Sequence, residues 1–134
     1  MNNDLISIII PSYNRKDFIC RAVESILKQN YRNIEIIIVD DGSTDGTFEF
    51  INDEYKSNEN VSVFKNEKNS GAGFCRKFGY NKSVGNYIIF MDDDDYYTNF
   101  DFFKHAIDIF QKYENVWMVS SSSIIEYSKE NKFE

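Results

Sequence analysis

Short apolar runs rich in β-branched residues alternate along this chain with longer stretches in which apolar residues recur at helical spacing. Four of these runs predict buried strands, namely "LISIIIP" (5–11), the start of "IEIIIVDDGSTDG" (34–46), "VSVF" (61–64) and "NYIIFMD" (86–92). A further run, "VWMVSSSSII" (116–125), predicts a fifth strand with a polar middle and with Trp117 in the core.

Helical spacing follows each of the first four strands. From Asp17 apolar pairs recur every four residues, and similar spacing is found within 47–56, 69–85 and 99–114. Asn99 is the predicted N-cap of the last helix. Strands that alternate with helices predict an α/β fold, in which a mostly parallel sheet is flanked by helices on both faces.

Polar clusters follow three of the predicted strands at the point where each strand ends. They are "PSYNR" (11–15), "DDGSTD" (40–45) and "DDDD" (92–95). In sheets of this kind ligands bind beyond the carboxyl ends of the strands. We therefore expect the three clusters to meet along one edge of the sheet and to form a binding site there.

Composition narrows the class of protein. With 134 residues and 42% hydrophobic content, the chain is expected to form a single soluble domain. A net charge of −7 argues against nucleic acid as a partner, and no apolar run approaches the roughly 20 residues of a transmembrane segment. Cys20 and Cys75 have no Cys or His at metal-ligand spacing, which predicts free thiols and a cytoplasmic location. The oligomeric state stays open.

The four consecutive carboxylates of Asp92–Asp95 repel one another unless a cation lies among them. Oxygen ligands suit Mg²⁺, Mn²⁺ or Ca²⁺ better than Zn²⁺, and a short acidic loop leaves positions of the metal open for water and a diphosphate. The alternative is a solvated acidic loop that binds nothing. The position directly after the apolar run "YIIFM" favours the metal site.

Other ligand-binding motifs fail at identifiable positions. An EF-hand loop beginning at Asp41 would place Asn52 where a bidentate Glu is needed. A dinucleotide fingerprint beginning at Gly71 would place Arg76 where the third glycine belongs, and no Gly-Lys-Ser/Thr sequence occurs.

Four segments in order resemble the signatures of family 2 glycosyltransferases with the GT-A (Rossmann-like) fold. They are "SIIIPSYNR", "QNYRNIEIIIVDDGSTDGT", "NSGAGFCRKFG" and "GNYIIFMDDDDYY". The resemblance implies that residues 1–134 are a single nucleotide-sugar-binding domain, the N-terminal part of a longer enzyme, with 127–134 as a loose tail. Two departures are Cys75 and Lys77, where the family has alanine and asparagine, and neither is expected to abolish donor binding.

The resemblance also assigns roles within the site. Asp41 would contact the base and Arg76 the phosphates, while the loop after the first strand would surround base and ribose through Pro11, Ser12, Tyr13, Asn14 and Arg15. The D-x-D motif falls on Asp92 to Asp94. Asp93 would face the ribose, and Asp94 together with Asp92 would bind Mn²⁺ or Mg²⁺. Tyr96 and Tyr97 could flank the sugar or pack beneath the loop.

The implied activity is metal-dependent transfer of a sugar from a nucleoside-diphosphate sugar, with a UDP-sugar favoured, to a carbohydrate or lipid-linked acceptor. Inversion at the sugar, polysaccharide biosynthesis and the inner face of the membrane are further expectations. No catalytic residue is assigned, because the family's general base is expected beyond Glu134. One alternative is a nucleotide-binding module without transfer activity. A nucleotidyltransferase is another, although "PSYNR" lacks its glycine-rich loop.

Overall fold

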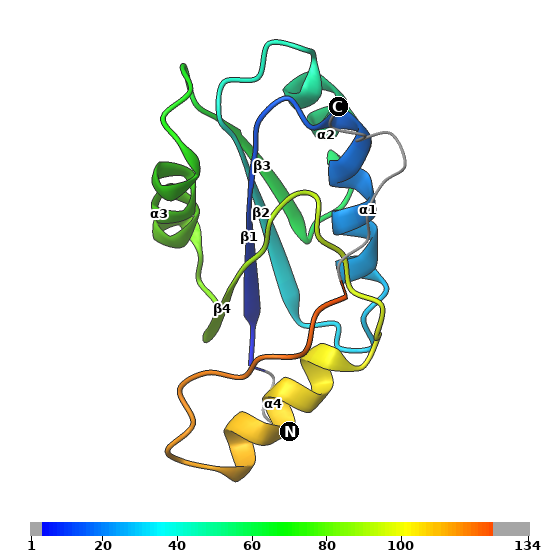
Figure 1. Ribbon diagram of the computed structural model, residues 1–134, viewed down its shortest axis with the longest axis vertical. Coiled ribbons are helices and arrows are strands. Elements are labelled where there is room, and N and C mark those ends of the chain that lie inside the picture. Colours follow the sequence, from blue (N-terminus) through cyan, green and yellow to red (C-terminus); the bar gives the residue numbers. More distant parts are fainter. Residues whose placement is uncertain (1–3, 125–134) are drawn as a thin grey trace, which may run out of the picture.

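The computed structural model describes residues 4–124, in which four strands and four helices alternate (Figure 1). The strands are β1 (Ile6–Ser12), β2 (Ile34–Asp40), β3 (Val61–Lys65) and β4 (Tyr87–Phe90). The helices are α1 (Lys16–Leu27), α2 (Thr47–Tyr55), α3 (Ala72–Lys82) and α4 (Phe102–Lys112). The four strands predicted before residue 93 and the four predicted helices are confirmed, with shifts of a few residues at their ends.

The four strands form one parallel sheet in the order β3-β2-β1-β4. All seven residues of β1 are buried, as expected for a central strand covered on both faces. Ser12 at the end of β1 pairs with Asp40 at the end of β2, so the two carboxyl ends are level. The predicted α/β fold with a parallel sheet is confirmed.

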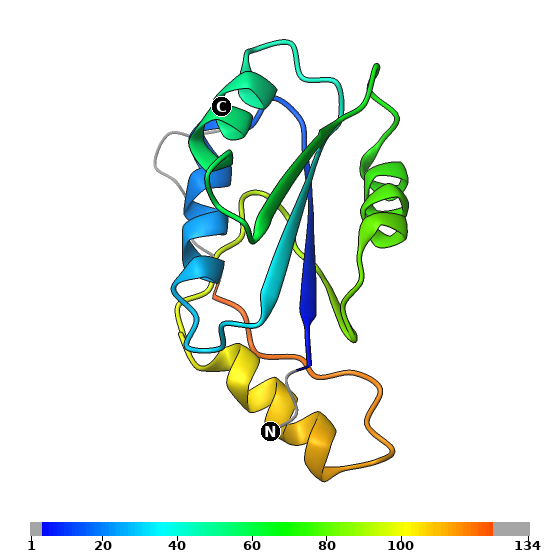
Figure 2. The same ribbon diagram turned by 180° about the vertical axis from the view of Figure 1, so that it is seen from behind.

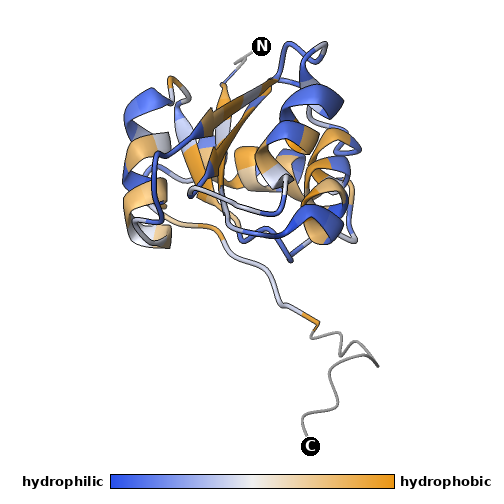
Figure 3. Ribbon diagram, turned by 90° about the horizontal axis from the view of Figure 1, so that it is seen from above, coloured by the Kyte–Doolittle hydropathy of each residue, from blue (hydrophilic) through white to orange (hydrophobic). Residues whose placement is uncertain are grey.

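Helices cover both faces of the sheet, with α1 and α2 on one face and α3 on the other (Figures 1 and 2). Successive residues of β1 therefore contribute to different cores. Ile8 and Ile10 belong to the larger core, which includes Ile19 and Ile26 of α1. Ile9 belongs to the smaller core beneath α3. The apolar strands lie between these two helical layers in Figure 3.

The start of helix α4 is held by Gln29, which lies just beyond the end of α1, and its N-cap is not Asn99, which corrects that prediction. The N-cap residue is Asp101, and its side chain makes no capping bond. Instead the fully buried Gln29 accepts the Phe103 N–H at 3.2 Å and donates to the Asn99 carbonyl at 2.7 Å. Gln29 thus satisfies the start of a helix that lies more than 70 residues further along the chain.

The predicted fifth strand is wrong over its described part, because residues 116–124 have no regular secondary structure. Trp117, predicted to be in the core, is 94% exposed, and Met118 and Ile124 are exposed too. A strand needs a neighbour for its backbone groups, and these residues pair with none of the four described strands. The predicted tail 127–134 lies outside the described residues. None of the described helices is long and apolar enough to span a membrane.

Candidate functional site

A cleft of about 320 Å³ lies at the carboxyl edge of the sheet, where the three polar clusters meet. Its walls come from the ends of β1, β2 and β4 and from the first residue of α3. The lining residues are Pro11, Ser12, Tyr13, Arg15, Asp41, Ala72, Asp92, Asp93 and Asp94. The structure therefore brings together most of the predicted site residues, and their individual roles in binding stay predictions.

Asn14 does not line this cleft but ties together the loops that follow β1 and β2. Its backbone N–H donates to Ser43 Oγ at 2.9 Å, and its Oδ1 accepts the Thr44 N–H at 2.9 Å. Asn14 has a positive φ of 52°, a conformation that asparagine tolerates better than most residues. It positions the loop that the other predicted residues occupy.

The two aspartates at the end of β2 differ in their partners. Asp40 is fully buried, and its Oδ1 accepts the Ser43 N–H at 2.9 Å, so it braces the loop. Asp41 Oδ1 accepts from Asn66 Nδ2 at 2.9 Å and from the Ser70 N–H at 2.8 Å. Asp41 Oδ2 accepts the Gly71 N–H at 2.7 Å.

These hydrogen bonds determine the charge of Asp41. Burial acts to raise the pKa of this carboxyl, but the bonds from Asn66, Ser70 and Gly71 outweigh it and leave the pKa below its usual value. Asp41 is therefore ionised at neutral pH. Its charge lies beside the N-terminal end of α3, where the helix dipole favours an anion.

Arg76 extends from α3 toward the acidic loop, where its Nη2 lies 2.6 Å from Asp92 Oδ1. The side chains of Arg76 and Asp92 are 36% and 57% exposed, so solvent screens the pair and it adds little to stability. Arg76, a predicted site residue, is not among the residues that line the cleft, but this pair brings its guanidinium to Asp92, which is one of them.

The carboxylates of the acidic loop differ in burial. Burial raises the pKa of Asp93, while the Ser12 hydroxyl and the charge of Arg15 oppose the increase and Asp94 and Asp92 add to it. Asp94 is exposed at the cleft. Within residues 4–124 no three His, Cys, Asp or Glu side chains are grouped closely enough to enclose a metal ion. An open site needs few protein ligands, and Asp94 and Asp92 are the carboxylates predicted to supply oxygens to it.

The residues after the acidic loop are anchored to α1. The Tyr97 N–H donates to Ser25 Oγ at 3.0 Å, and the Tyr97 ring stacks on Phe102 at a centroid distance of 5.3 Å. Tyr97 therefore packs beneath the loop, one of the two roles considered for it. The Arg21 guanidinium lies 4.2 Å from the ring centre of Tyr96, which remains partly exposed.

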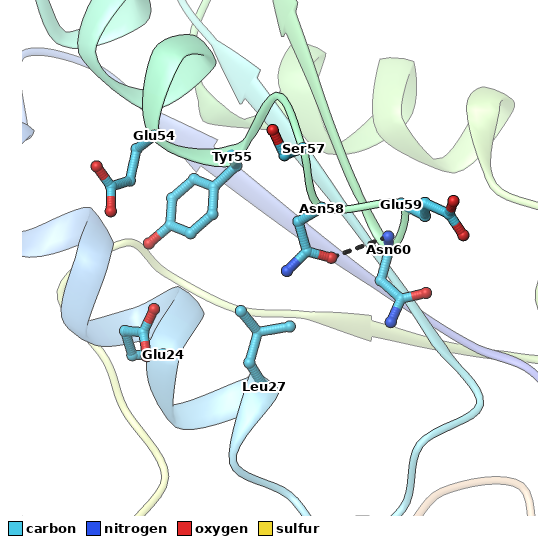
Figure 4. A pocket seen from close by; sticks show the side chains of 8 residues that line it. All are labelled: Glu24, Leu27, Glu54, Tyr55, Ser57, Asn58, Glu59 and Asn60. Carbon is cyan, nitrogen blue, oxygen red and sulfur yellow. Dashed lines mark hydrogen bonds between the residues drawn. The ribbon is translucent and has the colours of Figure 1, made fainter.

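A larger pocket of about 530 Å³ lies between α1 and the end of α2 (Figure 4). It is lined by Glu24, Leu27, Glu54, Tyr55, Ser57, Asn58, Glu59 and Asn60. This lining includes no cationic side chain that could bind a phosphate, and Glu59 points away from Glu24 and Glu54 (Figure 4). The smaller cleft at the carboxyl edge is the better candidate site.

Sequence reasoning missed Asn66, which contacts both Asp41 and Cys75. A signal for it was present, because Asn66 directly follows β3 just as the other polar clusters follow their strands. Ala72 was also missed as a lining residue, although it belongs to the small-residue segment that opens α3.

The parallel sheet, its two helical layers and the polar cleft at its carboxyl edge define a Rossmann-like α/β protein of the GT-A type. The chain belongs to glycosyl transferase family 2, because the model of that family matches residues 7–132.

Individual relatives agree with this assignment. An uncharacterized glycosyltransferase of Haemophilus influenzae is 42% identical over 99 residues, which are 74% of this chain and 40% of the relative. The Escherichia coli UDP-Glc:alpha-D-GlcNAc-diphosphoundecaprenol beta-1,3-glucosyltransferase WfaP is 41% identical over 120 residues, or 86% and 47% of the two chains. The structure of S. aureus TarS 1–349 in complex with UDP-GlcNAc superposes with a TM-score of 0.75 at 31% identity, over 81% of this chain and 32% of that one. The chain thus spans less than half of each.

Proposed function

We propose that this chain is the nucleotide-sugar-binding part of a glycosyltransferase that takes its sugar from a nucleoside-diphosphate sugar, with a UDP-sugar favoured. The observation that carries the proposal is the convergence of Asp41, Arg15 and the D-x-D aspartates on one cleft at the carboxyl edge of the sheet. The complex of TarS with UDP-GlcNAc, at 31% identity, supports the choice of donor.

The nucleoside half of the donor would lie against the loop after β1 and against Asp41. An ionised carboxylate only accepts hydrogen bonds, so it favours a base with a ring N–H, such as uracil or guanine. Cytosine presents a lone pair at the corresponding ring nitrogen and can donate only from its exocyclic amino group, so it would be disfavoured. Asp93, beside Ser12 at the floor of the cleft, would accept from a ribose hydroxyl.

Asp94 and Asp92 would hold a divalent cation, Mn²⁺ or Mg²⁺, through their carboxylate oxygens. When bound, such an ion acts as a Lewis acid that stabilises the negative charge on the departing diphosphate. Arg15 lines the cleft and Arg76 reaches Asp92 at its wall, so both would add positive charge near the diphosphate. Transfer with inversion, and a general base beyond Glu134, remain parts of this proposal.

The acceptor is proposed to be a hydroxyl of a carbohydrate or of a lipid-linked sugar. The name of the E. coli relative specifies a sugar linked to diphosphoundecaprenol, which supports the second form. A lipid-linked acceptor would bring the reaction, and with it polysaccharide biosynthesis, to the cytoplasmic face of a membrane. The free thiols of Cys20 and Cys75 are compatible with that compartment.

Thermal unfolding with UDP, GDP or CDP, each with and without Mn²⁺, tests the donor site. UDP at about 100 times its Kd should stabilise the fold by about 2.7 kcal/mol, which is a shift in Tm of several degrees. CDP should give a smaller shift. If none of the three nucleotides raises Tm at millimolar concentration, the donor-site proposal is wrong.

Asp94→Ala tests the metal ligand in the same assay. The variant should keep the Tm of the free protein, because Asp94 is exposed, and should lose the part of the UDP shift that depends on Mn²⁺. Asp108→Ala, at an exposed position of α4, is the matched control and should keep the full shift. An Asp94→Ala variant that unfolds, or that retains the Mn²⁺ effect, would contradict the assignment.

A further inference from the structure

Asn66 connects three elements at the inner end of the cleft. Its backbone N–H donates to the Asp40 carbonyl at 2.8 Å, which continues the pairing of β3 with β2. Its side-chain Nδ2 donates to Asp41 Oδ1 at 2.9 Å and lies 3.3 Å from Cys75 Sγ on α3. The Asn66 amide therefore spans the space between the end of β2 and the buried side of α3.

The backbone around Asp41 is closely packed. Gly42 has a φ of +75°, and a Cβ at this position would lie 2.9 Å from the backbone of Lys68. The segment 66–71 thus runs directly against 41–42, and its Ser70 and Gly71 N–H groups each bind one oxygen of Asp41. These backbone bonds hold both oxygens of the carboxylate from a single loop segment.

The side-chain bond from Asn66 adds a constraint that the backbone does not supply. Both backbone donors belong to adjacent residues of one loop, so they approach the carboxylate from the same segment. Asn66 approaches Oδ1 from the end of β3 instead. Donors from two different segments restrict rotation of the carboxylate about its Cβ–Cγ bond more than one segment can.

We propose that Asn66 is a positioning residue for nucleobase recognition, because its amide sets the orientation in which the Asp41 carboxylate faces the cleft. Asn66 is not among the residues that line the cleft, so within the described chain it would act through Asp41. The inference rests on the proposed donor site. It adds to that site a residue whose effect is confined to the nucleoside half of the ligand.

Binding of two probes to wild type and variants tests this inference by isothermal titration. UDP carries the base, whereas inorganic pyrophosphate with Mn²⁺ lacks it and reports on the metal and arginine side alone. Asn66→Ala should raise the Kd for UDP about tenfold, because a carboxylate that is free to rotate makes a poorer hydrogen bond to the base. The Kd for Mn²⁺-pyrophosphate should stay unchanged.

A second variant and a control complete the design. Asn66→Asp keeps the side-chain size but places a second carboxylate against Asp41, so it should weaken UDP at least as much as alanine does. If Asn66→Ala fails to fold, Asn66→Asp is compared with wild type in its place. Asn86→Ala removes an amide that binds the Leu5 N–H at the opposite end of the sheet and should change neither Kd.

The possible outcomes distinguish a failure of the role proposed for Asn66 from a failure of the donor site itself. Unchanged UDP binding by both Asn66 variants, or equal weakening of UDP and pyrophosphate, would show that Asn66 only supports the fold. Failure of the wild-type chain to bind UDP would overturn the donor site itself. Selective weakening of UDP with normal pyrophosphate binding is the result that we expect.

Discussion

Asp41 combines two requirements that a single buried carboxylate rarely meets together. In the proposed donor site it would have to stay charged, so that it only accepts hydrogen bonds from the base, and it would have to be held still at the wall of the cleft. Asn66, Ser70 and Gly71 satisfy both requirements with three donors. The same bonds that keep the pKa of Asp41 low also fasten the segment before α3 to the end of β2.

This arrangement predicts a pH-dependent contribution of Asp41 to stability. Asp41→Asn should lower the free energy of unfolding at pH 7 by about 1.5–3 kcal/mol, the cost of losing hydrogen bonds to a charged group. The pKa in the folded state lies below the unfolded value of about 3.9. The contribution is therefore complete above about pH 4 and is lost as the pH falls through the folded pKa.

Urea unfolding of wild type and Asp41→Asn across this pH range measures the contribution. The difference between the two proteins should be constant from pH 7 down to about pH 4 and should shrink below it. Asp108→Asn, on the exposed face of α4, should show no such trend. A difference that grows on acidification would mean that the charge of Asp41 destabilises the fold.

At the scale of elements, helix α3 packs very close to the sheet at Gly79. A Cβ at Gly79 would lie 2.5 Å from Ile9 Cγ2, so the helix can pack at this distance only without a side chain there. Gly73 of the same helix has no atom within 4 Å of the corresponding position. Because α3 carries Arg76, its distance from the sheet also affects where the guanidinium meets the acidic loop.

The two glycines of α3 therefore predict opposite effects of the same substitution. Gly79→Ala should destabilise the fold by about 1–3 kcal/mol, because Ile9 is fully buried and has little room to move. Gly73→Ala should stabilise it by about 0.4–1 kcal/mol, because alanine restricts the unfolded chain and its Cβ would meet no atom within 4 Å. The midpoints of urea unfolding report both changes. Equal midpoints for the two variants would contradict the close packing of α3 on β1.

At the scale of the whole molecule, the described chain divides into a packed body and the exposed segment 113–124. That segment has no regular structure, and its apolar side chains include the exposed Trp117 and Met118. Exposed backbone without hydrogen-bonded partners is where proteases cut first. Among the described residues, chymotrypsin should therefore cleave first after Trp117 or Met118 and leave the sheet and its helices intact.

Mass spectrometry of the early fragments checks this expectation. Buried aromatic residues such as Phe103 serve as internal controls, because they should be cut only after unfolding. An early cut inside β1, β2 or α1 would contradict the packed body. Protection of Trp117 would mean that this segment pairs with a strand edge, as its sequence pattern suggested.

Much of the fold could be predicted from local patterns, because a strand or helix that is buried on one or both faces has apolar residues at regular spacing in the sequence. The isoleucine-rich sequence of β1 predicted a buried strand, and the rule for strand ends predicted where the cleft lies. The fifth strand could not be judged in this way. Whether "VWMVSSSSII" is a strand depends on a neighbour that supplies backbone partners, which periodicity does not show.

The sequence by itself determined the order of strands and helices and the polar residues that follow each strand, because hydrophobic spacing and chain order are local properties. Only the tertiary structure decided which distant side chains meet. Asp41 with Asn66, Arg76 with Asp92 and Gln29 with the start of α4 are such pairs. Their geometry depends on the paths of loops and on the distances between packed layers, and these are set by contacts across the whole chain.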